Sequence, residues 1–119
     1  MATGARGEGF LELDGETYLI LFTNRAIADA ERTTGKSILQ LVNAGQNDSL
    51  GIGDVAHLLA VGLEWGRRDG QRQGGTYSIN DAWRLLDQLG FVACLEVVLA
   101  ALAAVLAYRP AKAVAVPPA

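Results

Sequence analysis

Residues 11–42, LELDGETYLILFTNRAIADAERTTGKSILQLV, constrain the fold of this chain more than any other segment. Asp14-Gly15 stands between two apolar runs, and a type I′ turn favours such a pair because both of its central residues take positive φ. The turn predicts an antiparallel hairpin in which Leu13 pairs with Glu16 and Leu11 with Tyr18. Helix signals follow the second strand at once, so the hairpin leads directly into helical structure.

The second strand of this hairpin, YLILF, is apolar on both faces. Side chains alternate between the two faces of a strand, so Tyr18 and Ile20 share one face while Leu19 and Leu21 lie on the other. An apolar outer face is unusual for a hairpin. Either another part of the chain covers Leu19 and Leu21, or these two side chains bind a partner.

Two capped helices are expected next. Thr23 or Asn24 can cap a helix with the body RAIADAERTT, and Gly35 stands where a left-handed C-terminal residue belongs. Ser37 then opens a shorter helix, ILQLVNA, which is expected to end at Gly45.

The rest of the chain predicts further helices. Apolar residues at three- and four-residue steps, beginning at Ile52, indicate an amphipathic helix over about residues 51–67, with Ser49 or Asp54 as its cap. Gly62 and Gly66 would permit close approach of another helix. A capping box at residues 78–81 opens a helix that Gly90 ends, and an Ala-rich run follows over residues 91–107.

The order of residues in the first forty positions resembles the small tail assembly chaperones of long-tailed phages, in particular the branch found in gene transfer agents. Members of that branch are sometimes labelled tail tube proteins. The matching positions are Gly15, Tyr18, Asn24, Ala26, Ala30, Glu31, Gly35, Lys36, Ser37 and Leu39. A weaker likeness continues through residues 58–63 and 78–90, so the resemblance covers roughly the first ninety residues.

The resemblance implies a role rather than a chemistry. None of the matching positions is catalytic in that family. Its members are expected to bind the long, helical tape-measure protein, to prevent its aggregation and to help tail-tube subunits polymerise around it. The alternative is a structural subunit of the tail tube or another virion component, although one hairpin among several helices is little strand for a tube.

Composition narrows the classes of partner. The net charge of −3 and the pI near 5.0 argue against nucleic acid, which needs a basic surface. The basic segment from Arg67 to Arg72 is interpreted as a solvated connection between helices.

The apolar run over residues 91–107 holds Glu96 and is short for a membrane span, so we expect a core helix, a helix with one face for a partner, or both. A lone Cys94 in that run, and a start without an apolar signal segment, favour a cytoplasmic protein of the bacterial host cell.

No constellation for catalysis, a cofactor or a metal stands out in the sequence. His57 is the single histidine, and Asp54, one turn earlier, is interpreted as its hydrogen-bond partner rather than as a fellow metal ligand. Thr34-Gly35-Lys36-Ser37 ends like a P-loop but lacks the glycine five residues earlier, so it is interpreted as a cap between helices. We therefore expect no enzyme activity, no cofactor and no metal.

Trp65 and Trp83 are large side chains for which the sequence allows two roles. Both are expected to seal the edge of the core, and one of them could also anchor a partner, because tryptophan is enriched at binding hot spots. The candidate partner-binding residues are thus Leu19, Leu21, Trp65 and Trp83. Self-association is left open.

Together these patterns predict an α+β fold, mostly α, in which an N-terminal β-hairpin precedes four to five short helices in a compact bundle. Residues 1–8 are expected to form a flexible leader, residues 9–107 a single domain, and residues 108–119 a disordered tail rich in Pro and Ala. The expected function is a non-enzymatic, cytoplasmic assembly factor that binds tape-measure and tail-tube proteins and neither nucleic acid nor membrane.

Overall fold

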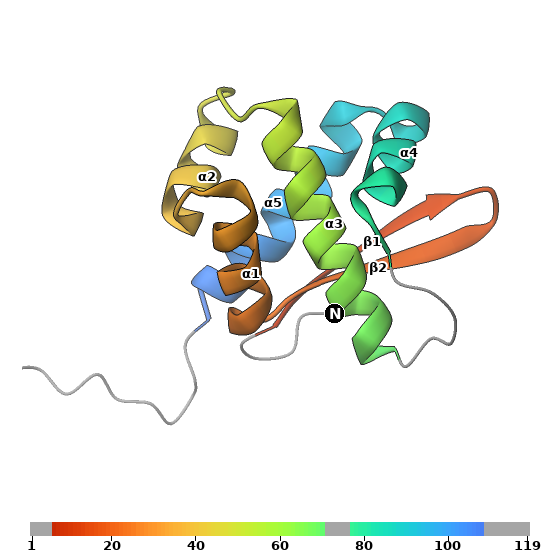
Figure 1. Cartoon of the computed structure of the whole chain (residues 1–119), viewed down its shortest axis with the longest axis horizontal. Coiled ribbons are helices and arrows are strands. Elements are labelled where there is room, and N and C mark those ends of the chain that lie inside the picture. The colour runs from red at the N-terminus through yellow and green to blue at the C-terminus, as the bar shows by residue number, and fades with distance from the viewer. Residues whose placement is uncertain (1–5, 71–76, 109–119) are drawn as a thin grey trace, which may run out of the picture.

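The computed structural model describes residues 6–70 and 77–108. Within these ranges the fold is α+β and mostly α, as predicted: an N-terminal two-stranded hairpin is followed by five helices (Figure 1). The strands are β1 (Gly7–Leu13) and β2 (Glu16–Phe22), and the helices are α1 (Asn24–Thr34), α2 (Ile38–Gln46), α3 (Ile52–Asp69), α4 (Ile79–Leu89) and α5 (Phe91–Leu106).

The hairpin has the predicted register, with Leu13 opposite Glu16 and Leu11 opposite Tyr18. Asp14 and Gly15 both have positive φ, 53° and 78°, as a type I′ turn requires. Strand β1 begins at Gly7, two residues earlier than expected, so only residues 1–5 of the expected leader lie outside the described residues. Most of the expected tail, residues 109–119, lies outside them as well.

Local capping signals define most helix ends. The Thr23 hydroxyl accepts the Ala26 N–H at the start of α1, and Gly35 ends that helix with φ of 74°. Ser37 with Gln40, and Ser78 with Asp81, form the capping boxes that open α2 and α4. The interpretation of residues 34–37 as a cap is thereby confirmed.

Helix α3 continues to Asp69 and contains Arg67 and Arg68, so the interpretation of these two residues as part of a connection between helices was wrong, and Arg72 lies outside the described residues. Two further helix boundaries differ from the expectation. Helix α2 continues through Gly45 to Gln46, because this glycine is the contact point with α5: a Cβ there would lie 2.7 Å from a methyl carbon of Leu99. Helix α3 begins after Gly51 with no side-chain cap, so neither Ser49 nor Asp54 caps it. Tertiary contact overrides the local stop signal in α2.

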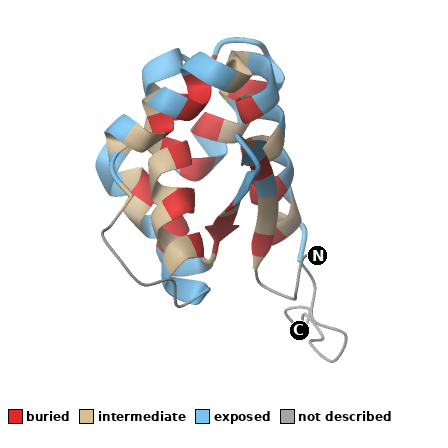
Figure 2. Ribbon diagram, turned by 90° about the vertical axis from the view of Figure 1, so that its right-hand side faces the viewer, coloured by how far each residue is buried: buried red, intermediate tan, exposed pale blue. Residues whose placement is uncertain are grey.

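Helices α3 and α5 pack on the inner face of the hairpin (Figure 2 shows the buried positions). Gly62 allows α3 to approach β2, since a Cβ there would lie 2.4 Å from a methyl carbon of Ile20. Gly7 similarly allows α5 to approach β1, since its Cβ would lie 1.8 Å from the Ala101 carbonyl oxygen. Gly62 and Gly66 therefore serve a helix–strand contact, and the expectation of a helix–helix contact was wrong.

The core lies between these layers. It contains Ile20, Phe22, Leu58, Leu59, Leu63, Leu85, Val98 and Leu102, all fully buried. Cys94 is also fully buried among them, and burial raises the pKa of its thiol, as expected for a small core residue. Ile52, assigned to the core stripe from the sequence, is instead 52% exposed at the first turn of α3.

Among the described residues, no helix combines the length and the apolar character that crossing a membrane would require. Helix α5 is the most apolar of the five. Its buried side, which includes Val98 and Leu102, packs on the hairpin and on α3. The prediction that this segment is a core helix is confirmed.

Candidate partner-binding surface

A hollow lies between α1, α3 and α4. Its volume is about 320 Å³, and it opens to solvent. Its apolar lining comes from Ala60 and Val61 of α3, Ile79 of α4 and the ring of Trp65. Its polar lining comes from Asp29, Arg32, Thr33, His57, Glu64 and Arg68. We call this feature the Trp65 hollow.

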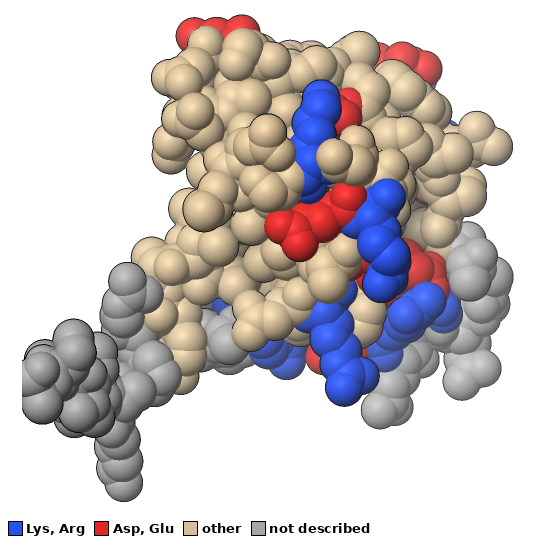
Figure 3. Space-filling view, turned by 60° about the vertical axis from the view of Figure 1, so that its left-hand side comes forward, with Lys and Arg blue, Asp and Glu red and all other residues tan. Residues whose placement is uncertain are grey.

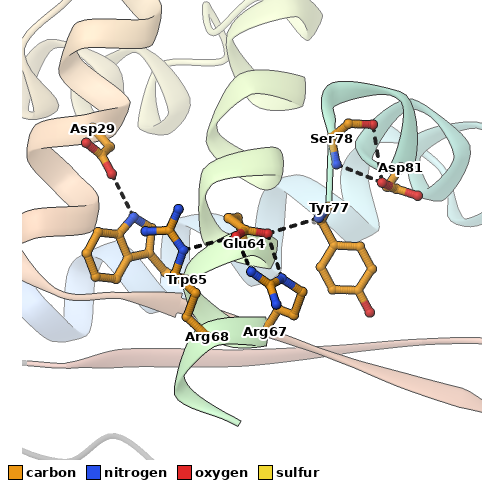
Figure 4. Close-up of polar contacts among 8 residues, drawn as sticks. All are labelled: Asp29, Glu64, Trp65, Arg67, Arg68, Tyr77, Ser78 and Asp81. Carbon is orange, nitrogen blue, oxygen red and sulfur yellow. Dashed lines mark hydrogen bonds and ion pairs between the residues drawn. The ribbon is translucent and has the colours of Figure 1, made fainter. Parts of the chain in front are cut away.

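Trp65 is held in place on two sides (Figure 4). Its indole N–H donates to the Asp29 carboxylate at 2.8 Å, which joins α3 to α1. The Arg68 guanidinium lies 5.2 Å from the centroid of the indole ring, within the range of a cation–π contact. A partly buried aromatic ring with a fixed orientation is the kind of group that anchors a partner's side chain.

Glu64 organises the other side of the hollow. Its carboxylate accepts from Nε and Nη2 of Arg67 at 2.9 and 2.6 Å, and from Nε of Arg68 at 3.0 Å (Figure 4). It also accepts the backbone N–H of Tyr77 at 2.9 Å, which ties α3 to the segment that leads into α4. Because the Arg67 guanidinium is its closest donor, the pKa of Glu64 falls to about 2. The carboxylate therefore stays ionised at any physiological pH.

The charges around the hollow are paired rather than isolated. Asp29 forms an ion pair with Arg32, and Glu64 with Arg67 and Arg68. On the face of the molecule drawn in Figure 3, basic and acidic side chains lie next to one another beside a broad uncharged area. Such a surface attracts neither a strongly acidic nor a strongly basic ligand, and it suits an amphipathic polypeptide better than a small ion.

The sequence predicted a hydrogen bond between His57 and Asp54, and this was wrong. Asp54 accepts from Lys36 Nζ at 2.6 Å, which links α3 to the segment before α2, while His57 lines the Trp65 hollow. Among the described residues no group of three or more metal-binding side chains comes together.

Trp83 has the simpler of its two expected roles. It is partly buried and packs against the core from α4, so it seals the core edge as predicted, and it does not line the Trp65 hollow. Nothing in its contacts singles it out as an anchor for a partner.

The two leucines on the outer face of β2 differ from each other. Leu19 is half-buried, whereas Leu21 is only 2% exposed, so the expectation that Leu21 is available to a partner was wrong. Helix α3 runs close to β2 at Leu19. A Cβ on Gly66 would lie 2.2 Å from the Leu19 carbonyl oxygen, and Asp69 at the end of α3 pairs with Arg6 just before β1.

Sequence reasoning missed the exposed apolar side chains of other elements. Phe10 on β1 is 51% exposed, Leu39 on α2 is 68% exposed, and Val92 on α5 is 64% exposed. Leu39 is one of the positions that carry the family resemblance. The positions of the apolar residues around the helix in α2 could have indicated that Leu39 is exposed.

Comparison with known proteins adds no relative: no protein-family model, no curated protein and no solved structure matches this chain.

Proposed function

We propose that this protein is a non-enzymatic tail assembly chaperone of a long-tailed phage or a gene transfer agent, which binds the tape-measure protein and assists assembly of the tail tube. The observation that supports the proposal most is the Trp65 hollow. Its lining combines apolar side chains and a fixed aromatic ring with paired charges, a combination that suits an amphipathic helix.

The resemblance in the first forty residues supports the same role. Most of its positions build the fold. Gly15 and Gly35 take positive φ, Ala26 and Ala30 are fully buried, and Ser37 caps α2. Leu39 has no such structural use, since its side chain is 68% exposed, and an exposed apolar side chain is a natural contact for a partner.

Catalysis has little support from the geometry. The two carboxylates of the hollow are both paired: that of Glu64 is bound by two arginines, and that of Asp29 by Trp65 and Arg32. A general acid or base needs a pKa near the working pH, and that of Glu64 is about 2. A structural role in a finished tube is the weaker alternative, because the described sheet has only two strands.

The test is co-expression with the tape-measure reading frame of the same phage or gene transfer agent, followed by measurement of complex formation and of the soluble fraction of the tape-measure protein. Ala60→Phe fills the Trp65 hollow without removing any polar contact, and it should weaken binding by about tenfold or more. Ala103→Phe places the same side chain on the exposed side of α5 and serves as the matched control.

Equal binding by Ala60→Phe and the wild type would refute the hollow as the docking site. Absence of any complex with the wild type would refute the chaperone proposal as a whole. Recovery of the protein in stoichiometric amounts from purified mature particles would favour the structural alternative.

A further inference from the structure

The turn end of the hairpin extends past the helices on one side of the molecule (Figure 1). Among residues 6–70 and 77–108 the sheet consists of β1 and β2, so within these ranges each strand has one edge that faces no other strand. Such an edge presents backbone N–H and C=O groups that can pair with a further strand. The two edges have different surroundings in this molecule.

The register identifies the groups at each edge. In a two-residue hairpin the pair that flanks the turn exchanges hydrogen bonds, and hydrogen-bonded pairs then alternate with non-bonded pairs. Leu13 and Glu16 flank the turn, so the backbone groups of Phe10 and Glu12 point away from β2. On β2 those of Thr17 and Leu19 point away from β1.

Helix α3 closes the edge of β2. It passes so near to Leu19 that a Cβ on Gly66 would lie 2.2 Å from the Leu19 carbonyl oxygen. Helix α5 covers β1 on its inner face, where Gly7 and Gly9 are its contact points, whereas Phe10 and Glu12 are both exposed. In the described part of the chain, the edge of β1 near the turn is therefore the one left open.

The net negative charge of the protein is concentrated in the hairpin. Residues 6–22 contain the acidic residues Glu8, Glu12, Asp14 and Glu16 and one basic residue, Arg6, which gives −3. The remaining nine acidic and nine basic residues of the chain cancel, so the hairpin alone accounts for the total of −3. On the outer face of β1, Glu8 and Glu12 stand on either side of Phe10, which is 51% exposed.

We propose that the open edge of β1, at Phe10 and Glu12, accepts an extended segment of another protein as a third strand, and that this segment carries lysine or arginine beside apolar residues. Backbone pairing along the edge would provide affinity. Contact with Phe10 and attraction to Glu12 would provide the preference for a basic, partly apolar strand.

The negative charge of the hairpin makes two other occupants of the β1 edge unfavourable. A second copy of the chain would bring an equally acidic hairpin to this edge, and like charges on adjacent strands are unfavourable. A nucleic acid would bring its phosphates to an acidic surface. The proposal concerns a different surface from the Trp65 hollow and does not require the partner to be a tape-measure protein.

The experiment uses the full-length protein and a fluorescent peptide of about seven residues that alternates lysine and valine. Fluorescence anisotropy measures its affinity, and isotope-edited NMR measures solvent protection of the amide protons of Phe10 and Glu12. We expect binding that weakens as salt is raised, with new protection at these two amides. A peptide with glutamate in place of lysine should bind at least about tenfold more weakly.

Variants separate backbone pairing from charge. Glu12→Pro removes an N–H that points away from β2, and Thr17→Pro makes the matched change on the opposite edge. Glu12→Pro should weaken binding by about tenfold, and by more than Glu12→Gln does, whereas Thr17→Pro should leave it unchanged. Glu12→Lys retains the N–H and changes the charge of residues 6–22 from −3 to −1, so it should reduce the preference for the lysine peptide over the glutamate peptide. This variant tests the proposal even if the proline variants fail to fold.

Equal binding of the lysine peptide to Glu12→Pro and wild-type protein, or amide protection that maps to another element, would overturn the proposal. So would a dimer of the free protein that Glu12→Pro dissociates, since this would make the occupant a second copy. Ala60→Phe should bind the peptide as the wild type does, so failure at this edge is distinguishable from failure of the Trp65 hollow.

Discussion

The inner and outer faces of the β1–β2 hairpin are formed by the same two strands but have different surroundings. On the inner face, Ile20 and Phe22 are fully buried under α3, and Gly7 brings the backbone of β1 against α5. On the outer face, Phe10 is 51% exposed with Glu12 beside it. The inner face belongs to the protein interior, whereas the outer face is open to solvent near the turn, where we propose that a third strand pairs.

The largest effect should come from the core beneath the inner face. Leu59 is fully buried, and Leu59→Ala should lower the free energy of unfolding by about 2–5 kcal/mol in chemical denaturation. Leu39→Ala removes the same atoms from a side chain that is 68% exposed and should cost less than about 0.5 kcal/mol. Equal losses for the two variants would mean that the assigned phase of α3 is wrong.

A somewhat smaller effect is expected where β1 meets α5. Gly7→Ala would place a Cβ 1.8 Å from the Ala101 carbonyl oxygen, and backbone cannot move aside as a side chain can, so we expect a loss of about 1–3 kcal/mol. Gly53→Ala adds the same methyl group in α3 where no atom lies within 4 Å, and thermal denaturation should show little change or a gain. A neutral Gly7→Ala would show that the inner face is loosely packed.

The ion pairs of Glu64 on α3 should contribute less to the free energy of unfolding than the packing of the core does. Glu64→Gln keeps the shape of the side chain but removes the charge that Arg67 and Arg68 bind, so at pH 7 it should destabilise the protein by about 1–2 kcal/mol. The folded pKa of about 2 lies below the ordinary 4.5, so this stabilisation is complete above pH 4.5 and is lost as the pH falls from 4.5 towards 2. A difference between the two proteins that persists unchanged at pH 2 would contradict this account.

The smallest effect on stability belongs to the outer face. Phe10→Ser should change the free energy of unfolding by less than about 0.5 kcal/mol, because the side chain is half in solvent and its partner in register, Leu19, is only half-buried. The same variant should weaken binding of the alternating lysine–valine peptide measurably. A loss of stability above about 1 kcal/mol would mean that the outer face is part of the core after all.

Signals that act within a few residues could be recognised from the sequence. The turn at Asp14-Gly15, the caps at Thr23 and Ser37, and the stop at Gly35 all occur where they were predicted, because each depends on backbone geometry that adjacent residues determine. The hairpin register followed from the turn alone. The fold class was therefore accessible before any tertiary contact was known.

Features that depend on distant residues could not be predicted in the same way. The contact of Gly62 with Ile20 follows from the path of α3 along the hairpin, which no local pattern specifies. The Trp65 hollow depends on a hydrogen bond to Asp29 across 36 positions of the chain. Trp65 was selected as a candidate only for its size, and its surroundings became apparent with the structure.

The burial of Cys94 makes it possible to measure local opening of this protein by chemical labelling. It is the single sulfhydryl of the chain, and it sits at 0% exposure on the side of α5 that faces the interior. An alkylating reagent can reach it only when α5 lifts away, so the labelling rate reports how often that happens. Measuring this rate with and without the lysine–valine peptide would show whether peptide binding makes such opening more or less frequent, with no engineered label.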